Sequence, residues 1–280
     1  MPLSSILQSQ LRICYAGERS TIEICYFGIT PRYTRNRLLI KSLMKAGCKV
    51  ILCSDDSPYP ERLLTLTRKH KGLSYDIMLV AGSYSQPLVP LAKKIAKGPV
   101  VMDYFLGFTE TLVDDRKIVP PNSPKAYLYR ILDSVTPKFA DLIISDTNSH
   151  IDYYCDTFHL NRNRFRRIFV GSDEDVFYPR TTKAKKDKFK VLFWGSFIPL
   201  HGISYIIKAA KLVERHEDIV IEIRGFGQTY RKMRKLSESL DVRNVNFTPP
   251  VPYEKLANCI ASADVCLGVF GQSEKAKRVI

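Results

Sequence analysis

Two glycine-containing loops, each directly after a predicted strand, hold the residues best suited to bind a phosphate group. The first is Gly-Ser-Phe-Ile-Pro-Leu-His-Gly from Gly195 to Gly202, and the second is Arg224-Gly225-Phe226-Gly227. Glycine lets the backbone approach a phosphate, and the helix after each loop offers free N–H groups. His201 would gain charge beside an anion, because a neighbouring negative charge raises its pKa. Taken alone, each loop is also explained by a tight turn without a ligand.

Other chemistry has weaker support. Asp173 and Asp175 form an Asp-x-Asp pair that could hold a divalent cation, but acidic residues are common in turns, and this pair lies at the predicted hinge. Tyr230 stands where a dinucleotide-binding GxGxxG loop has its third glycine. The sequence contains no Walker loop, nucleophile elbow or zinc-ligand spacing.

The elements that must position these loops alternate along the whole chain. The pattern predicts strands over 22–27, 49–53, 76–80, 100–103, 141–145 and 167–170, and helices over 35–46, 88–97, 124–140 and 150–158. After a lysine-rich interruption over 178–190, it predicts strands over 190–194, 219–223, 245–247 and 265–269, and helices over 202–215, 230–240 and 253–262. Such alternation is typical of parallel sheets built from βαβ units.

The interruption predicts two domains, an N-terminal Rossmann-like domain over 1–180 and a C-terminal one over 181–280. The fold class is therefore α/β with two Rossmann-like domains. A doubly wound domain usually has five or six strands, and the second set supplies four. We therefore expect the second domain to be incomplete.

Composition narrows the classes of function. The 280 residues carry 43 Lys and Arg against 28 Asp and Glu, a net charge of +15, with ordinary globular fractions of apolar and charged residues. This excess of positive charge is compatible with binding to anionic ligands or to an anionic membrane face. The sequence contains no nucleic-acid-binding motif, so no nucleic acid partner is expected. The lysines between 183 and 190 are interpreted first as a solvated linker and second as a phospholipid contact.

Localisation follows from the absence of targeting signals. Apolar residues at helical spacing over 3–11 suggest a loosely packed leader or a short membrane-surface helix rather than a secretory signal. The seven cysteines form no CxxC pair and fit a reducing compartment. We expect a cytoplasmic protein, with peripheral contact at the inner membrane face as a second interpretation.

Taken together, these residues resemble the GT-B-fold glycosyltransferases of family 4, also called glycosyl transferases group 1. The most specific motif is G-x-D-x-x-x-F-x-P, here Gly171, Asp173, Phe177 and Pro179, followed by the loops from Gly195 and Arg224. The stretches 244–247, 251–256 and 263–265 continue the match in the family's order.

The resemblance implies an enzyme that transfers a sugar, with retention of configuration, from a nucleotide-sugar donor to a glycan or lipid-linked acceptor. The N-terminal domain would bind the acceptor and the C-terminal domain the donor. No metal or other cofactor would be needed. By position, the residues implied at the donor are Gly28, Arg35, Thr147, Gly195, Ser196, Arg224, Gly225, Gly227 and Val251, and the candidate catalytic residues are Asp103 and His201.

The chain departs from the family at its phosphate-binding cations. Ser196 stands where the family commonly has Arg, and His201 where it has Lys. Arg32, Arg35 or Arg224 could replace them. A glutamate that grips the donor ribose would lie beyond Ile280, so the resemblance implies a truncated chain. Two alternatives therefore stay open: a non-catalytic remnant or partner subunit of a glycosyltransferase, and an NAD-dependent Rossmann protein.

Overall fold

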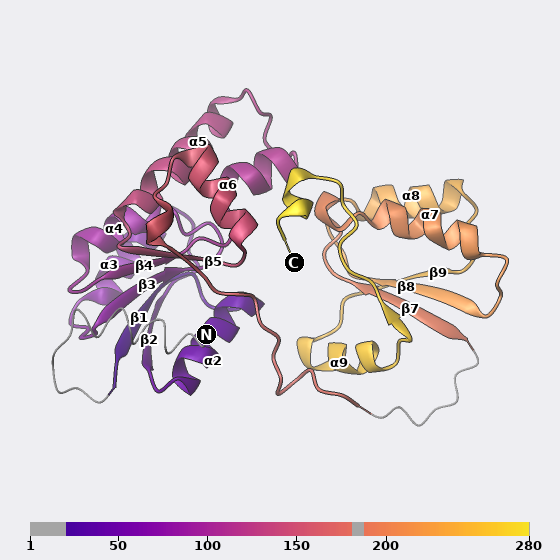
Figure 1. The fold of residues 1–280 in the computed structure, drawn as a ribbon, viewed down its shortest axis with the longest axis horizontal. Coiled ribbons are helices and arrows are strands. Elements are labelled where there is room, and N and C mark those ends of the chain that lie inside the picture. The colour runs from indigo at the N-terminus through magenta and orange to yellow at the C-terminus, as the bar shows by residue number, and fades with distance from the viewer. Residues whose placement is uncertain (1–20, 181–187, 280) are drawn as a thin grey trace. The chain divides into compact units, whose positions relative to one another are not determined.

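The computed structural model describes residues 21–180 and 188–279 (Figure 1). The leader over 3–11, and Lys183, Lys185 and Lys186 of the lysine run, lie outside the described residues. The chain divides into two compact units. Residues 21–113, 119–171 and 278–279 belong to unit 1, and residues 114–118, 172–180 and 188–277 belong to unit 2. The division therefore places two short segments, Asp114–Ile118 and Arg278, away from the unit of their nearest neighbours in sequence.

Unit 1 contains a parallel sheet in the order β2-β1-β3-β4-β5-β6. Its strands are β1 (Glu23–Gly28), β2 (Lys49–Ser54), β3 (Ile77–Ala81), β4 (Val100–Asp103), β5 (Leu142–Ser145) and β6 (Phe165–Arg167). Its helices are α2 (Thr34–Lys45), α3 (Glu61–His70), α4 (Leu88–Ile95), α5 (Pro124–Val135) and α6 (Asn148–Phe158). A π-helical turn, η1 (Thr109–Asp115), follows β4.

Helices cover both faces of this sheet, as parallel sheets require. Leu66 of α3, Val89 of α4 and Tyr154 of α6 pack into the core on one face. On the other face, Leu39 and Leu43 of α2 pack against the strands. The strands read as nearly continuous apolar runs because both of their faces are buried, and all five residues of β3 are buried.

Unit 2 contains a smaller parallel sheet in the order β10-β7-β8-β9. Its strands are β7 (Phe189–Trp194), β8 (Ile219–Arg224), β9 (Val245–Thr248) and β10 (Val265–Cys266). Its helices are α7 (Ile203–Val213), α8 (Tyr230–Ser239) and α9 (Tyr253–Ala261), with short 3-10 turns η4 (Pro199–His201) and η5 (Glu274–Lys277). Figure 1 shows α7 and α8 on one face of this sheet and α9 on the other.

The predicted fold class, α/β with two Rossmann-like domains, is confirmed, and most elements lie within two residues of their predicted bounds. Three predictions differ. The strand expected over 167–170 is Phe165–Arg167, the helix expected to reach residue 140 gives way to a 3-10 turn at Thr136, and the last strand contains only Val265–Cys266. Helix α3 was not predicted, although Leu63 and Leu66 give it an apolar face.

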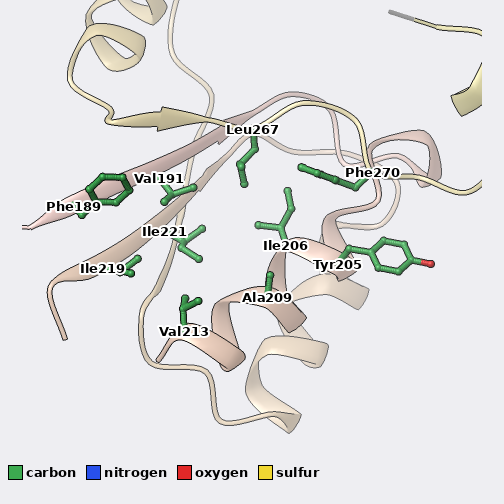
Figure 2. Close-up of a pocket in the computed structure, with 10 residues that line it drawn as sticks. All are labelled: Phe189, Val191, Tyr205, Ile206, Ala209, Val213, Ile219, Ile221, Leu267 and Phe270. Carbon is green, nitrogen blue, oxygen red and sulfur yellow. The ribbon is translucent and has the colours of Figure 1, made fainter. Parts of the chain in front are cut away.

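An apolar groove of about 340 Å³ runs beside α7 on the face of the second sheet (Figure 2). Strands β7 and β8 form its floor, and α7 forms one wall. Leu267 and Phe270, which follow β10, also line the groove. Figure 2 shows Phe189 and Phe270 at opposite ends of the groove. Both aromatic side chains are 44% exposed. An apolar surface of this kind attracts other apolar molecules.

We expect the groove to bind an apolar fluorescent dye such as anilinonaphthalene sulfonate. The double substitution Phe189→Thr and Phe270→Gln should remove most of the fluorescence increase, because it removes the aromatic surface at both ends. Leu212→Gln is the matched control, since Leu212 lies on the same helix, is 80% exposed and does not line the groove. An equal loss in the control, or no dye binding by the unmodified protein, would show the expectation to be wrong.

Candidate functional site

In both sheets most candidate residues lie at or after the carboxyl ends of strands, and Gly28 and Gly195 border the points where the strand order reverses. In doubly wound sheets, ligands bind in the crevice at this switch point. In unit 1 it lies between β1 and β3, and in unit 2 between β7 and β10. Gly28 ends β1, and a Cβ added there would lie 2.0 Å from the carbonyl oxygen of Ala81. Only glycine therefore allows these two strand ends to approach so closely.

Arg35 and Asp103, two of the predicted site residues, form a buried ion pair. Arg35 Nε lies 3.0 Å from both carboxylate oxygens, and Nη2 lies 2.8 Å from Oδ1. Arg35 Nη1 also donates to the carbonyl of Ile168. Burial by itself would lower the pKa of Arg35, but the charge and hydrogen bonds of Asp103, together with the charges of Asp146 and Tyr154, outweigh burial and raise it. In this structure, Arg35 therefore neutralises a carboxylate of its own unit.

The loop after β5 carries a second buried charge cluster. Thr147 caps α6 by accepting a hydrogen bond from the His150 backbone N–H, and its hydroxyl donates to the Arg278 carbonyl. His150 Nδ1 lies 2.6 Å from Asp146 Oδ1, and its Nε2 lies 3.2 Å from Glu110 Oε1. Arg278 Nε donates to the same Glu110 oxygen at 2.9 Å. Two cations and two carboxylates therefore form one network in unit 1.

This network changes the protonation of His150. Burial by itself would lower the pKa of its imidazole, but hydrogen bonds and charge from Asp146 and Glu110 outweigh burial and raise it to about 9. His150 is therefore protonated at neutral pH. It lies in the first turn of α6, the helix that Thr147 caps.

In unit 2, the two predicted glycine loops contact each other. Gly225 has a φ of +145°, and a Cβ added there would lie 1.9 Å from the carbonyl oxygen of Gly195. The backbone N–H of Gly195 donates to the Arg224 carbonyl, and that of Phe197 donates to the Phe226 carbonyl. A Cβ on Gly227 would lie 2.8 Å from the backbone nitrogen of Phe197. The glycines therefore serve loop packing as well as any ligand.

The first loop presents Ser196 and His201 beside the switch point. Ser196 is exposed, and its carbonyl accepts a hydrogen bond from His201 Nδ1. A carbonyl only accepts, so Nδ1 carries the proton and the other ring nitrogen is free of it in the neutral form. Burial lowers the pKa of His201 below its ordinary value, and the Ser196 hydrogen bond offsets this only in part. The imidazole is therefore neutral at neutral pH in this structure.

Arg224 and Val251 lie at the ends of β8 and β9. Arg224 donates to Glu222 Oε1 through Nε at 2.9 Å and to the Pro249 carbonyl through Nη1 at 2.7 Å. Burial alone would raise the pKa of Glu222, but Lys190 and Arg224 lower it, so this carboxylate is ionised. Val251 is half-buried in the loop before α9. Arg224 thus holds the β8 and β9 ends together.

The structure brings the predicted residues into two sets. Gly28, Arg35, Asp103 and Thr147 belong to unit 1, and Gly195, Ser196, His201, Arg224, Gly225, Gly227 and Val251 belong to unit 2. Their roles toward a ligand stay predictions. Sequence reasoning missed the partners Glu110 and Arg278, which are 168 residues apart. The i,i+4 spacing of Asp146 and His150 was the one local signal of this network.

None of the helices within residues 21–180 and 188–279 has the length and apolarity needed to cross a membrane. In the same residues, no three or more His, Cys, Asp or Glu side chains are grouped so that they could hold a metal ion. The expected independence from metals stays a prediction.

Comparisons with known proteins show what the chain is similar to. Residues 177–268 match the family model described as Glycosyl transferases group 1. The chain resembles the structure of Anabaena HepE in complex with UDP and glucose, with a TM-score of 0.63, 12% identity, and coverage of 88% of this chain and 74% of HepE. Over these residues the match to the family model confirms the resemblance found in the sequence motifs.

Two further structures show the same fold. WaaG, described as a glycosyltransferase involved in lipopolysaccharide biosynthesis, gives a TM-score of 0.51 at 15% identity, covering 88% of this chain and 74% of WaaG. A mutant of S. aureus TarM, in complex with Fondaparinux, alpha-GlcNAc-glycerol and UDP, gives 0.53 at 15% identity, covering 74% of this chain. The chain spans 40% of the length of TarM. A comparison with curated proteins gave no match.

The Arg35–Asp103 pair generates a stability prediction. Asp103→Asn should destabilise the protein by about 3 kcal/mol, because it leaves the Arg35 guanidinium buried without a counter-charge. Lys93→Gln is the control, since it breaks the exposed Lys93–Asp141 pair and should cost less than about 1 kcal/mol. Urea unfolding measures both. Equal, small losses in the two variants would contradict a structural role for the buried pair.

The His150 network generates a pH prediction. Folding raises the pKa of His150 from 6.5 to about 9, so its stabilisation is complete below pH 6.5 and is lost as pH rises through 9. The free energy of unfolding should therefore fall by about 3 kcal/mol over this range, relative to His150→Gln. Parallel pH profiles for the two proteins would show that His150 is not protonated in the folded state.

Proposed function

We propose that this protein is a retaining glycosyltransferase that binds a nucleotide-sugar at the unit 2 switch point. The bond between the anomeric carbon and the diphosphate oxygen breaks, and a bond to an acceptor hydroxyl oxygen forms. The hydroxyl proton is taken up by the leaving diphosphate. The protein's task is to stabilise a positively charged sugar and a departing diphosphate as they separate.

One observation carries the proposal: two glycine loops meet at the carboxyl ends of β7 and β8, and the loop after β7 borders the β7–β10 switch point, in the region that matches the group 1 family. The backbones of Gly195 and Gly225 approach each other too closely there for a side chain to stand between them, and the N–H groups of these two glycines donate to the carbonyls of Arg224 and Thr248. The complexes of HepE with UDP and glucose and of TarM with UDP support a uridine nucleotide as the first donor to test.

For the acceptor, we propose a class of molecule and the unit that binds it. We assign acceptor binding to the N-terminal unit and expect a glycan or lipid-linked acceptor. The net charge of +15 would favour contact with an anionic membrane surface from the cytoplasmic side. WaaG, whose description places it in lipopolysaccharide biosynthesis, supports this class of acceptor. The proposal includes no resident metal or cofactor.

A second candidate function is a non-catalytic partner subunit. It is favoured by the loop from Gly195 to Gly202, which contains no Lys or Arg, and by the engagement of Arg224 with Glu222. Such a protein could keep the crevice and yet lack the charges that stabilise a leaving group. Turnover of any nucleotide-sugar separates the two functions.

The first experiment is a thermal-shift panel with UDP, GDP, ADP, their sugars and NAD at millimolar concentration. A ligand at about 100 times its dissociation constant adds about 2.7 kcal/mol, which shifts the melting temperature by several degrees. We expect a shift with one nucleoside diphosphate and its sugar, and hydrolysis or transfer of that sugar in the presence of EDTA. A shift with NAD alone, or with none of the ligands, would contradict the proposal.

Two glycine variants test whether the nucleotide binds at the glycine loops of unit 2. Gly227→Ala should reduce the nucleotide-induced shift, because its Cβ would lie 2.8 Å from the Phe197 backbone and displace the loop. Gly171→Ala adds the same methyl group where nothing lies within 4 Å, and it should leave the shift unchanged.

A further inference from the structure

The segment Asp114–Ile118 belongs to unit 2, although more than fifty residues separate it in sequence from the rest of that unit. It lies beside the loops proposed to bind the donor. Gln228 Nε2, directly after the Gly225–Gly227 loop, donates to the Arg116 carbonyl at 2.7 Å. Ser273 Oγ, in the segment after β10, donates to Asp115 Oδ1 at 2.8 Å. The segment is therefore held by the loop after β8 and by the segment after β10.

Arg116 and Asp115 also lie close to His201, the last residue before Gly202. The charge of Asp115 raises the pKa of His201 and the charge of Arg116 lowers it. The segment after β10 contacts the same place, since the backbone N–H of Phe270 donates to the His201 carbonyl. Three segments distant in sequence thus converge on the end of the first glycine loop.

The crevice needs a cation, because a leaving diphosphate carries negative charge and the loop from Gly195 to Gly202 contains no Lys or Arg. Arg224 is held by Glu222, and Lys275 is buried and has a partner. Arg116 Nε is also buried, and within the described residues it makes no hydrogen bond. Its guanidinium therefore keeps an unused donor at the crevice.

We propose that Arg116 is the residue that neutralises the donor diphosphate, supplied from the segment after β4 rather than from the glycine loop. This deepens the proposed function and rests on it. Arg116 would pair with phosphate oxygens, for which a guanidinium fork is well suited. It would also offset Asp115, whose Oδ2 is buried without a hydrogen bond and would otherwise repel the diphosphate.

The test measures binding of UDP, uridine and inorganic pyrophosphate by calorimetry at low salt. Arg116→Ala should weaken UDP and pyrophosphate roughly 10- to 100-fold, the range expected for a lost charge-assisted hydrogen bond, and leave uridine unchanged. Arg116→Lys should restore part of the loss. Asp115→Asn should tighten UDP, because it removes a negative charge. Arg231→Ala, which removes an exposed arginine of α8, is the control and should change none of them.

The outcomes separate this inference from the proposed function. If UDP binds the unmodified protein and Arg116→Ala equally well, the role of Arg116 is wrong and the donor site stands. If UDP does not bind but pyrophosphate binds through Arg116, the phosphate site stands and the proposed donor is wrong. If neither UDP nor pyrophosphate binds the unmodified protein, both proposals are overturned. A melting temperature for each variant shows whether it is folded, and a folded Arg116→Lys decides the matter if Arg116→Ala is not.

Discussion

The close approach of two backbones at the ends of β7 and β8 is the constraint on which the crevice in unit 2 depends. A Cβ on Gly225 would lie 1.9 Å from the Gly195 carbonyl oxygen, so no other residue type fits there without moving a strand end. The approach follows from parallel pairing, which brings the carboxyl ends of neighbouring strands to one edge. Both glycine loops, and the segments that pack on them, are positioned by this edge.

Charge is arranged differently in the two units. In unit 1, Arg35 with Asp103, and His150 and Arg278 with Glu110 and Asp146, form closed networks in which buried cations meet buried carboxylates. Such networks stabilise a particular arrangement of loops, since a single unpaired charge in them would be costly. In unit 2, Arg224 is paired in the same way, whereas the Nε of Arg116 has no hydrogen bond within the described residues. Unit 2, which is proposed to bind the donor, therefore contains a guanidinium, that of Arg116, with an unused hydrogen-bond donor.

The histidines illustrate how environment decides protonation. His150 lies in the first turn of α6, and His201 lies two residues before α7. The side chain of His150 is buried, and that of His201 is half-buried. His150 has carboxylates beside both ring nitrogens, and these raise its pKa. Burial lowers the pKa of His201, and the hydrogen bond to the Ser196 carbonyl offsets burial only in part. A charged imidazole thus belongs to the structural network of unit 1, and a neutral one to the crevice of unit 2. Stabilisation of a leaving diphosphate must then come from another group.

The sequence by itself determined the fold class, most of the elements and the two glycine loops, because apolar periodicity and glycine position are local signals. It also placed Arg224 directly after a predicted strand and His201 directly before a predicted helix. Which charged side chains pair with one another depends on the tertiary structure. The bond between Arg278 and Glu110 spans 168 residues, and the segment of Arg116 joins a unit that begins far along the chain. Partners of this kind depend on how whole strands and loops pack, and no spacing in the sequence encodes them.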